Sequence, residues 1–306
     1  MDVSIIIVSY NTKELTKNCL RSVYERTKAI HFEVIVVDNG SSDGSADMIK
    51  NDFPQAALIE NKSNLGFGAA NNKGLEIAKG KYVFYLNSDT VLLNDAASIF
   101  FDYWEANARK KSIGAIGANL LGQDEATLVH SYGRFLDIDK EIKNCARAVA
   151  SSAAYTILSL FSKRFPPKIP KAQPCAFYTG PVDYVNGADL FVQNDSGARF
   201  DERFFMYCEE TDMQKQMAKA GKERLIIDGP KIIHLEGASA KKALDRVRVH
   251  ASAAGLNFTL SRVLYFKKNG KSRAKTWLLK ALTILLWLNP LVFKSARAYI
   301  KKLALA

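Results

Sequence analysis

Acidic side chains stand where apolar runs of this 306-residue chain end. Asp89 follows the run at 82–86, and Asp38 follows the run at 32–37. Such runs are typical of buried parallel strands, whose carboxyl ends form the edge of a sheet where ligands bind. We therefore expect Asp89 to hold a metal ion against a phosphorylated ligand, and Asp38 to accept a hydrogen bond from a nucleobase or a ribose. The alternative for both is a carboxylate that closes a turn or caps a helix.

A second acidic group, Glu209, Glu210 and Asp212, directly follows a cluster of aromatic residues. Apolar surroundings and mutual repulsion both raise the pKa of a carboxyl group, which suits a general base. The alternative is a solvated helix start, where acids complement the helix dipole. His234 follows an apolar pair and could coordinate a metal, although a lone histidine is usually structural.

These residues need a sheet to position them, and the first ninety residues alternate strand and helix patterns. Strands are expected at 3–8, 32–37, 57–60 and 82–86, with helices at 14–26, 46–51 and 69–79 between them. This alternation predicts an α/β fold with a mostly parallel, right-handed sheet flanked by helices. A helix at 95–111, strands at 113–120, 184–192 and 224–227, and a helix at 213–220 are expected to follow.

Two later stretches are harder to assign. Gly187 interrupts the strand pattern at 184–192, where the backbone could approach a ligand closely. The segment 145–165 is rich in alanine and apolar residues, and could form a core helix, a mobile acceptor loop or a patch that touches a membrane.

The glycine pattern argues against two classes of nucleotide-binding enzyme, the dehydrogenases and the nucleotidyltransferases. Gly66 and Gly68 resemble the start of a dinucleotide fingerprint, but Asn71 replaces the third glycine and the group follows the third strand, which makes a dehydrogenase unlikely. A nucleotidyltransferase would share the sheet and the metal. It would normally carry a glycine-rich basic loop after the first strand, where residues 9–12 read Ser-Tyr-Asn-Thr.

Basic charge is concentrated at the end of the chain. The net charge is +12, and residues 240–306 hold fifteen Lys or Arg against one acid, Asp245. The apolar residues Trp277, Leu278, Ala281, Leu282, Leu285 and Leu288 share one helical face. On this face the charge-free run 281–288 ends where Asn289 and Pro290 break the pattern, well short of the ~20 residues that a spanning helix needs. We therefore expect no membrane span but an interfacial helix attracted to anionic phospholipid. The alternative is a helical hairpin that packs on the body or on a second copy in a homodimer, and nucleic acid is not an expected partner.

The remaining composition favours a reducing compartment. Four cysteines, at 19, 145, 175 and 208, are scattered without a CxxC pair, which argues against a zinc site and for free thiols. The first residues lack a basic leader and a long apolar run, so no signal peptide is expected. We expect a cytoplasmic protein at the inner face of the cell membrane.

Seven short motifs taken together resemble the family 2 glycosyltransferases, most closely the bacterial rhamnosyltransferase-like branch. They are SYN at 9–11, VVDNGSSD at 36–43, NLGFGAAN at 64–71, NSD at 87–89, GAD at 187–189, FDERFFMY at 200–207 and HxxGxS at 234–239. The similarity extends from residue 3 to about residue 240. The resemblance implies a Rossmann-like GT-A domain at 1–240, followed by a basic amphipathic helical tail at 241–306.

The resemblance also implies a role for each motif. Tyr10 and Asp38 would line the nucleobase pocket with Asn64 nearby, and Asp89 would bind the metal, Mg²⁺ or Mn²⁺, that holds the diphosphate. His234 would approach the metal or the diphosphate. The tripeptide Gly187, Ala188 and Asp189 would face the donor sugar and the acceptor.

Two positions depart from the family pattern. Asn87 stands at the first position of the usual Asp-x-Asp metal motif, so one carboxylate does what two often do. Glu210 stands where the family usually has an aspartate as catalytic base, and the extra methylene moves the carboxylate by roughly an ångström.

The expected activity is therefore an inverting, metal-dependent transfer of a sugar. A nucleotide-diphosphate sugar is the expected donor, with rhamnose favoured, and a glycan or lipid-linked molecule of cell-surface polysaccharide synthesis is the expected acceptor. Two alternatives stay open: a membrane-associated module that binds nucleotide sugars without catalysis, and a nucleotidyltransferase.

Overall fold

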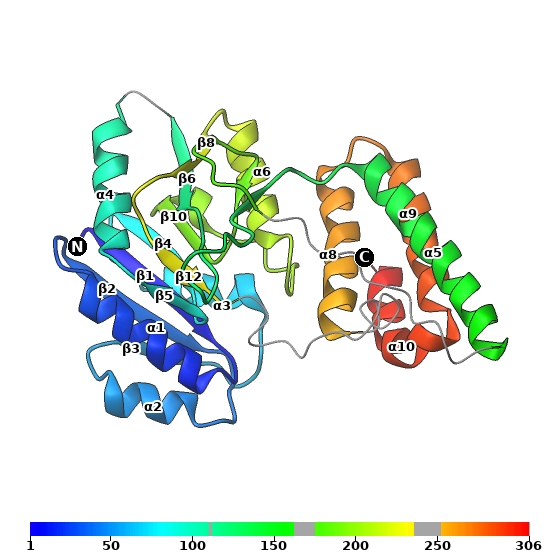
Figure 1. Ribbon diagram of the computed structural model, residues 1–306, viewed down its shortest axis with the longest axis horizontal. Helices are drawn as coiled ribbons and strands as arrows, with labels where there is room; N and C mark the ends of the chain where they lie inside the picture. Colours follow the sequence, from blue (N-terminus) through cyan, green and yellow to red (C-terminus); the bar gives the residue numbers. More distant parts are fainter. Residues whose placement is uncertain (110–111, 162–174, 236–251, 306) are drawn as a thin grey trace. The chain divides into compact units, whose positions relative to one another are not determined.

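The structure is a computed structural model that describes residues 1–109, 112–161, 175–235 and 252–305 (Figure 1). Its described residues divide into two compact units. The first takes those of Met1–Phe135, Pro174–Phe205 and Glu209–Ser239, and the second takes those of Leu136–Gln173, Met206–Cys208 and Ala240–Ala306. The expected boundary at 240 falls outside the described residues. The second unit also includes a helix from before residue 174, which the sequence assigned to the first domain.

The first unit is built on one mixed sheet, which confirms the predicted α/β fold. Its strand order is β3-β2-β1-β4-β10-β6-β11-β8. The strands are β1 Val3–Ser9, β2 Phe32–Asp38, β3 Ala57–Glu60, β4 Tyr82–Asn87, β6 Ile113–Ala118, β8 Gly180–Pro181, β10 Asp189–Gln193 and β11 Glu223–Ile227. The first four are mutually parallel, as expected, and β6 is parallel to β11. The strands β2, β1 and β4 thus end along the carboxyl edge of the sheet. Ser9 is paired there with Asp38, and Val8 with Asn87.

Helices cover both faces of the sheet (Figure 1). They are α1 Lys13–Arg26, α2 Ser45–Asp52, α3 Phe67–Leu75, α4 Ala96–Asn107 and α6 Glu209–Lys219, with a 3-10 turn at Ser196–Ala198. The alternating side chains of β1 show why two layers form. Ile5 and Ile7 enter one apolar core with α1 and α4, whereas Ile6 enters the other with α3 and α6 residues.

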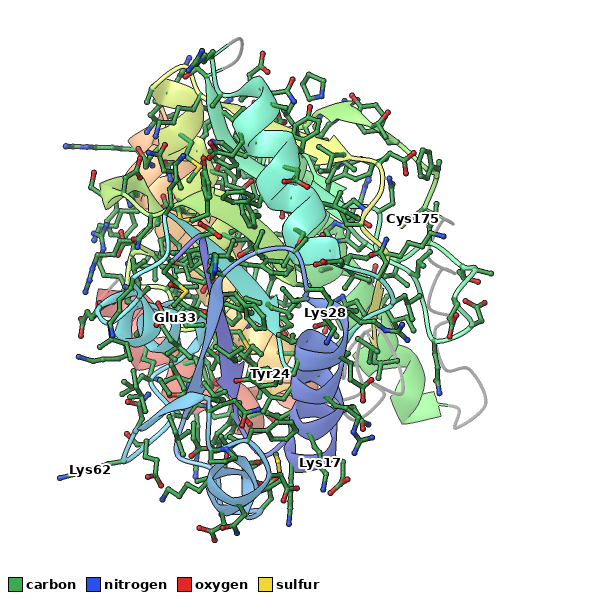
Figure 2. The ribbon with its side chains drawn as sticks, turned by 90° about the vertical axis from the view of Figure 1, so that its left-hand side faces the viewer. Lys17, Tyr24, Lys28, Glu33, Lys62 and Cys175 are labelled. Atoms are coloured by element: carbon green, nitrogen blue, oxygen red, sulfur yellow. The ribbon has the colours of Figure 1, made fainter. Side chains whose placement is uncertain are left out.

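Polar contacts close the amino edge of the sheet. Glu33 of β2, labelled in Figure 2, accepts hydrogen bonds from the Ser4 hydroxyl at 2.7 Å and from Lys79 N–H at 2.6 Å. The Ser4 hydroxyl in turn accepts one from Gly80 N–H at 2.8 Å. A ligand is therefore expected at the opposite, carboxyl edge, where Asp38 and Asp89 lie.

Two features of this sheet differ from the simplest expectation. Strand β10 runs antiparallel to both β4 and β6, and so reverses the direction in the middle of the sheet. Two short ribbons flank the carboxyl edge, β5 Thr90–Leu92 with β12 Ile232–His234, and β7 Tyr132–Gly133 with β9 Tyr184–Val185. The expected strand at 184–192 is therefore two strands, β9 and β10, which Gly187 separates.

The second unit contains the helices α5 Ile138–Phe161, α8 Ala253–Asn269, α9 Arg273–Trp287 and α10 Pro290–Leu305. The part of the segment 145–165 that the structure describes, up to Phe161, is thus helical. Buried Leu279, Leu286 and Trp287 form the inner face of α9. Arg262 of α8 pairs with Glu141 of α5 at 2.7 Å, and both are largely buried. No helix among the described residues has the length and apolar character that a membrane crossing requires.

Candidate active site

Asp89 and His234 meet at the carboxyl edge of the sheet. The pairing of β5 with β12 sets His234 opposite Thr90, next to Asp89. Asp89 Oδ1 lies 3.4 Å from His234 Nε2, and each residue is 8% exposed. The carbonyl of Asp89 also accepts a hydrogen bond from Leu235 N–H at 2.9 Å. Two residues 145 positions apart, predicted separately as metal ligands, are thus neighbours.

The donor set of this pair fits a divalent cation. A carboxylate oxygen and an imidazole nitrogen are both ligands of Mn²⁺ and related ions, and they converge here. His234 Nδ1 is buried without a hydrogen-bond partner among the described residues, so none of them fixes the tautomer of the ring through that nitrogen. The described residues contain no group of three or more His, Cys, Asp or Glu side chains that could hold a metal. A diphosphate and water would supply further ligands of the kind that such ions take.

The turn 186–188 joins the Asp89 strand end to the acidic helix. Asn87 N–H donates to the carbonyl of Ala188 at 3.0 Å, which fixes this turn beside the end of β4. On the other side, a Cβ atom added to Gly187 would lie 3.7 Å from Glu210 Cβ and 3.5 Å from the Phe67 ring. Gly187 therefore lies in ordinary packing distance of Phe67 and Glu210, and the predicted approach of its backbone to a ligand stays a prediction.

Glu210 lies in the first turn of α6, partly buried. Removal from water disfavours the charged carboxylate and raises the pKa of Glu210 above its ordinary value near 4.5. This is the direction that the aromatic surroundings predicted for a general base. Glu209 and Asp212, in the same helix start, are almost fully buried, so the alternative of a solvated acidic helix end does not describe them.

Asp38 uses one carboxylate oxygen to close a turn, and its other oxygen has no hydrogen-bond partner among the described residues. It is the last residue of β2 and is 3% exposed. Its Oδ2 accepts a hydrogen bond from Ser41 N–H at 3.0 Å, as the turn alternative required. Its Oδ1 is buried without a hydrogen-bond partner among the described residues. Tyr10 follows β1 at the same edge and is 45% exposed.

Asn39 organises the loop that contains Asn64. Its Nδ2 donates to Asn64 Oδ1 at 3.0 Å and to the carbonyl of Gly66 at 3.2 Å, and its Oδ1 accepts from Leu65 N–H at 3.0 Å. Asn64 Oδ1 also accepts from Gly66 N–H at 2.8 Å. The loop 64–66 is therefore tied to the end of β2 beside Asp38, which brings two residues predicted for the nucleobase pocket together.

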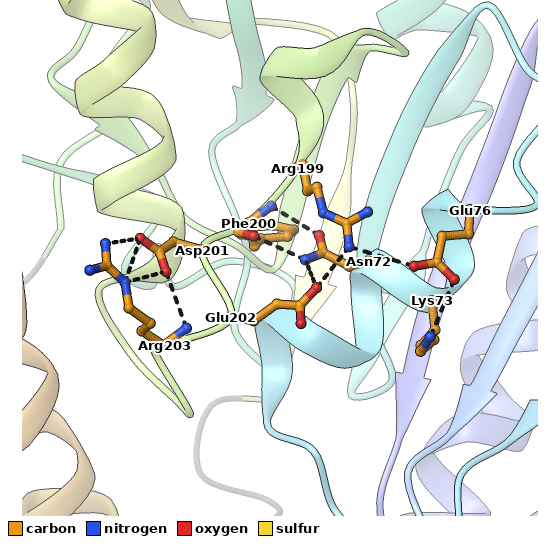
Figure 3. A network of polar contacts seen from close by, with 8 residues as sticks. All are labelled: Asn72, Lys73, Glu76, Arg199, Phe200, Asp201, Glu202 and Arg203. Atoms are coloured by element: carbon orange, nitrogen blue, oxygen red, sulfur yellow. Dashed lines mark hydrogen bonds and ion pairs between the residues drawn. The ribbon is translucent and has the colours of Figure 1, made fainter.

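Asn72 fixes the segment that leads to α6 (Figure 3). Its Oδ1 accepts from Phe200 N–H, and its Nδ2 donates to the Phe200 carbonyl and to Glu202 Oε1, all at 2.9 Å. Arg199 and Glu202 are also paired, at 2.8 Å. Together these contacts hold the motif at 200–207 on α3.

Asp189 differs from its neighbours in being fully buried. Its Oδ2 accepts from Ala118 N–H at 2.7 Å within the sheet, and burial raises its pKa well above the ordinary value. Ala188 is also buried, and its contribution here is the carbonyl that accepts from Asn87. Within the tripeptide predicted to face the sugar, Gly187 is the residue that lies against Phe67 and Glu210. Gly237 and Ser239 of the histidine motif lie outside the described residues.

Several contacts around the candidate site gave no signal in the sequence. Asn39, Asn72 and Gln214 are buried amides whose partners are mostly backbone groups far along the chain. Their only sequence signal is a polar amide inside a motif or on a buried helix face, which does not identify a partner. His234 and Asp89 were both found as candidates, but the pairing of β5 with β12 that brings them together was not, because these strands are only three residues each.

Comparison with known proteins places this geometry in a family. Residues 4–164 match the model of glycosyl transferase family 2. A poly(ribitol-phosphate) beta-glucosyltransferase of Bacillus spizizenii is 31% identical over 121 residues, which are 38% of this chain and 19% of that protein. An N-acetylglucosaminyl-diphospho-decaprenol L-rhamnosyltransferase of Mycobacterium tuberculosis is 24% identical over 244 residues, which are 75% of each protein. The chain spans only 19% to 38% of the lengths of the first three curated relatives.

Solved structures show the same fold at low identity. A mannosyltransferase from Pyrobaculum calidifontis, in complex with GDP-Man and Mn²⁺, gives a TM-score of 0.52 at 16% identity and covers 99% of this chain and 75% of that one. GalNAc-T7 with UDP, GalNAc and Mn²⁺ gives 0.53 at 15% identity, with 95% and 58% covered. The fold is thus GT-A-like, and because the family model matches more than half of the sequence, the chain belongs to glycosyl transferase family 2.

Proposed function

We propose that the protein is an inverting, metal-dependent glycosyltransferase that uses a nucleotide-diphosphate sugar. The observation that carries this proposal is the turn 186–188, which contacts the strand end before Asp89 on one side and Glu210 on the other. A donor sugar at Gly187 would therefore have its diphosphate on the Asp89 side and its opposite face toward Glu210. In-line displacement with inversion needs the leaving group and the base on opposite sides in this way.

The side chains would divide the chemistry as follows. Glu210 accepts the proton of an acceptor hydroxyl as its oxygen bonds to the anomeric carbon, and the bond from that carbon to the diphosphate breaks with its electron pair. Asp89 and His234 would hold the divalent cation, which supplies positive charge against the departing diphosphate. Asp38, Tyr10 and Asn64 would bind the base and ribose of the donor, for which the unpartnered Asp38 Oδ1 is a candidate acceptor.

We propose rhamnose as the transferred sugar and a lipid-linked glycan of cell-surface polysaccharide synthesis as the acceptor. The rhamnosyltransferase from Mycobacterium tuberculosis supports both, because it is matched over 75% of its length and its name specifies a diphospho-decaprenol acceptor. UDP-GlcNAc and GDP-Man are found with structural neighbours, so other donors belong in the test.

We also propose that the tail 241–306 binds the anionic inner face of the cell membrane, where a lipid-linked acceptor would be met. Trp277, Leu278, Ala281, Leu285 and Leu288 of the α9 region are exposed and fall within an arc of about 100° on a helix. The opposite face contains the buried Leu279, Thr283 and Leu286. One face of α9 therefore packs in the unit, and the other is left to a partner. A second copy in a homodimer is the alternative occupant.

The transferase is tested by measuring nucleoside diphosphate release from dTDP-, UDP- and GDP-sugars with Mg²⁺ or Mn²⁺ and membrane extract as a source of acceptors. We expect metal-dependent release with one donor, which Asp89→Asn and Glu210→Gln each lower by about a hundredfold or more. Glu25→Gln, in an exposed position on α1, is the matched control and should leave release unchanged. Donor binding without release by the wild type would point to a non-catalytic module, and release of pyrophosphate would point to a nucleotidyltransferase.

A further inference from the structure

Gln214 is a fully buried amide on α6, one helical turn after Glu210. Its Oε1 accepts a hydrogen bond from Val185 N–H at 2.8 Å, and its Nε2 donates to the Val185 carbonyl at 2.8 Å. The same Nε2 lies 3.2 Å from the carbonyl of Glu210. The side chain thus satisfies both backbone groups of Val185, as a neighbouring strand would, and joins them to the residue we propose as base.

Val185 leads directly into the turn 186–188. On its far side this turn is held by Asn186, whose N–H donates to the Ser131 carbonyl at 2.9 Å and whose Nδ2 donates to the His130 carbonyl at 2.8 Å. On the helix side, Gln214 holds Val185, and Gly187 lies against Glu210 Cβ. The turn is therefore fixed between two anchors, and Gln214 is the one that belongs to the helix of the base.

We propose that Gln214 is a positioning residue that sets the spacing between the turn at Gly187 and the carboxylate of Glu210. In the reaction proposed above, on which this inference rests, that spacing is the distance from the donor sugar to the base. A displacement of about 1 Å between reacting groups can lower a rate about a hundredfold. Loss of the clamp is therefore expected to lower kcat more than it raises KM for the donor.

The variant Gln214→Glu gives this role a distinctive signature. An ionised carboxylate has no hydrogen to donate and would face the Val185 carbonyl, whereas a neutral carboxylic acid has one donor and one acceptor and restores both contacts. Burial favours the neutral form, so the clamp should be rebuilt as the pH falls. Titratable groups occur on the same helix and on the strands beside it: Glu209, Glu210, Asp212, Lys215 and Lys219 on α6, Tyr184 on β9, Asp189 on β10, and Glu223 and Arg224 on β11. Because the wild type has them too, activity is compared as the ratio of variant to wild type.

The experiment measures kcat and KM for the identified donor from pH 5.5 to 8.5 in wild type, Gln214→Glu and Gln214→Met. We expect Gln214→Glu to have a kcat at least about tenfold below wild type at the alkaline end, and the ratio to recover about tenfold towards the acid end. Gln214→Met, which cannot form the contacts at any pH, should be low throughout. Gln216→Glu adds the same charge to the same helix, where the native amide contacts Asp212 at 3.4 Å and Lys219 at 3.2 Å on its own helix, and its ratio should stay flat.

Thermal unfolding of each variant, with all assays run below the lowest midpoint, separates this effect from loss of fold. An active wild type with a flat Gln214→Glu ratio would overturn the inference while leaving the transferase intact. The inference would also be overturned if the activity ratios of Gln214→Glu and Gln216→Glu rose together as the pH falls. A wild type that released no nucleoside diphosphate from any donor would overturn the proposed function itself, and this inference with it.

Discussion

Glu210, which we propose as the base, has neighbours that fix its backbone on two sides. Its Cβ faces Gly187, and its carbonyl is one of the groups that Gln214 contacts. The backbone at this position is thus held between α6 and the turn 186–188, and it has little freedom to move towards a substrate. With this backbone fixed, a shorter side chain would hold the carboxylate of the proposed base farther from an acceptor.

We therefore expect Glu210→Asp to lower kcat by about tenfold to a hundredfold, because the carboxylate is withdrawn by about 1 Å. The base is active when it is ionised, so kcat/KM should fall as the pH drops through the pKa of Glu210, which burial raises above 4.5. In Glu210→Asp this acid limb should move to lower pH, because the unperturbed pKa of aspartate is lower. Nucleoside diphosphate release across pH measures both effects, and donor affinity by calorimetry should be unchanged.

The matched control is Glu223→Asp, which makes the same change at an exposed residue of β11. Its kcat and acid limb should coincide with those of the wild type. A kcat for Glu210→Asp equal to or above the wild-type value would show that the site is not built around the longer side chain.

At the scale of elements, the site depends on loops that approach each other more closely than a side chain allows. Gly66 has φ +89°, and a Cβ there would meet the Phe205 carbonyl oxygen at 2.1 Å. Phe67 N–H donates to that same carbonyl at 2.9 Å. The loop that contains Asn64 is therefore pressed directly on the segment that precedes α6.

Gly66→Ala is expected to be severely destabilising. Gly221→Ala is the control that has a positive φ without a backbone clash. Gly221 also has a positive φ, +73°, but a Cβ there would meet nothing within 4 Å. Gly221→Ala should lower the free energy of unfolding by about 1–2 kcal/mol, which is the cost of the backbone conformation alone. Gly66→Ala adds a backbone clash and should cost at least about 3 kcal/mol. Urea unfolding of both variants tests this, and equal losses would contradict the close approach.

The sequence predicted the elements well because the signals are local. The apolar runs at Phe32–Asp38 and Tyr82–Asn87, with the turn residues after them, placed Asp38 and Asp89 at the carboxyl edge of the sheet. Local pattern carries no strand direction, so the reversal at β10 could not be read from it. It also carries no partner, and so the contacts of Asn39 and Gln214 with distant backbone groups were missed.

At the scale of the whole molecule, charge and apolar surface coincide in the tail. No acidic residue occurs from 252 to 305, whereas eleven Lys or Arg do. Within the described part of the tail, Lys275 pairs with Asp139 and Arg262 with Glu141, both on α5. Lys280 lies over the ring of Trp277, 4.9 Å from its centroid, and so sets a cation beside the exposed apolar face of α9. Apolar side chains flanked by cations are typical of helices that lie in the interface of an anionic membrane.

We therefore expect the full chain to co-sediment with vesicles that contain about a third anionic phospholipid, and much less with neutral ones. Trp277 and Leu285 are 67% and 54% exposed, so the double variant Trp277→Ser, Leu285→Ser removes apolar area without opening a core. It should weaken vesicle binding by about tenfold or more, because each side chain contributes about 1.5–3 kcal/mol when buried. Ile77→Ser, which removes an apolar residue of the first unit that is 44% exposed, should bind as the wild type does. The opposite outcome is a wild type that fails to bind vesicles and sediments as a dimer, while the double variant sediments as a monomer. In that case the apolar face contacts a second copy of the chain, and the membrane proposal is wrong.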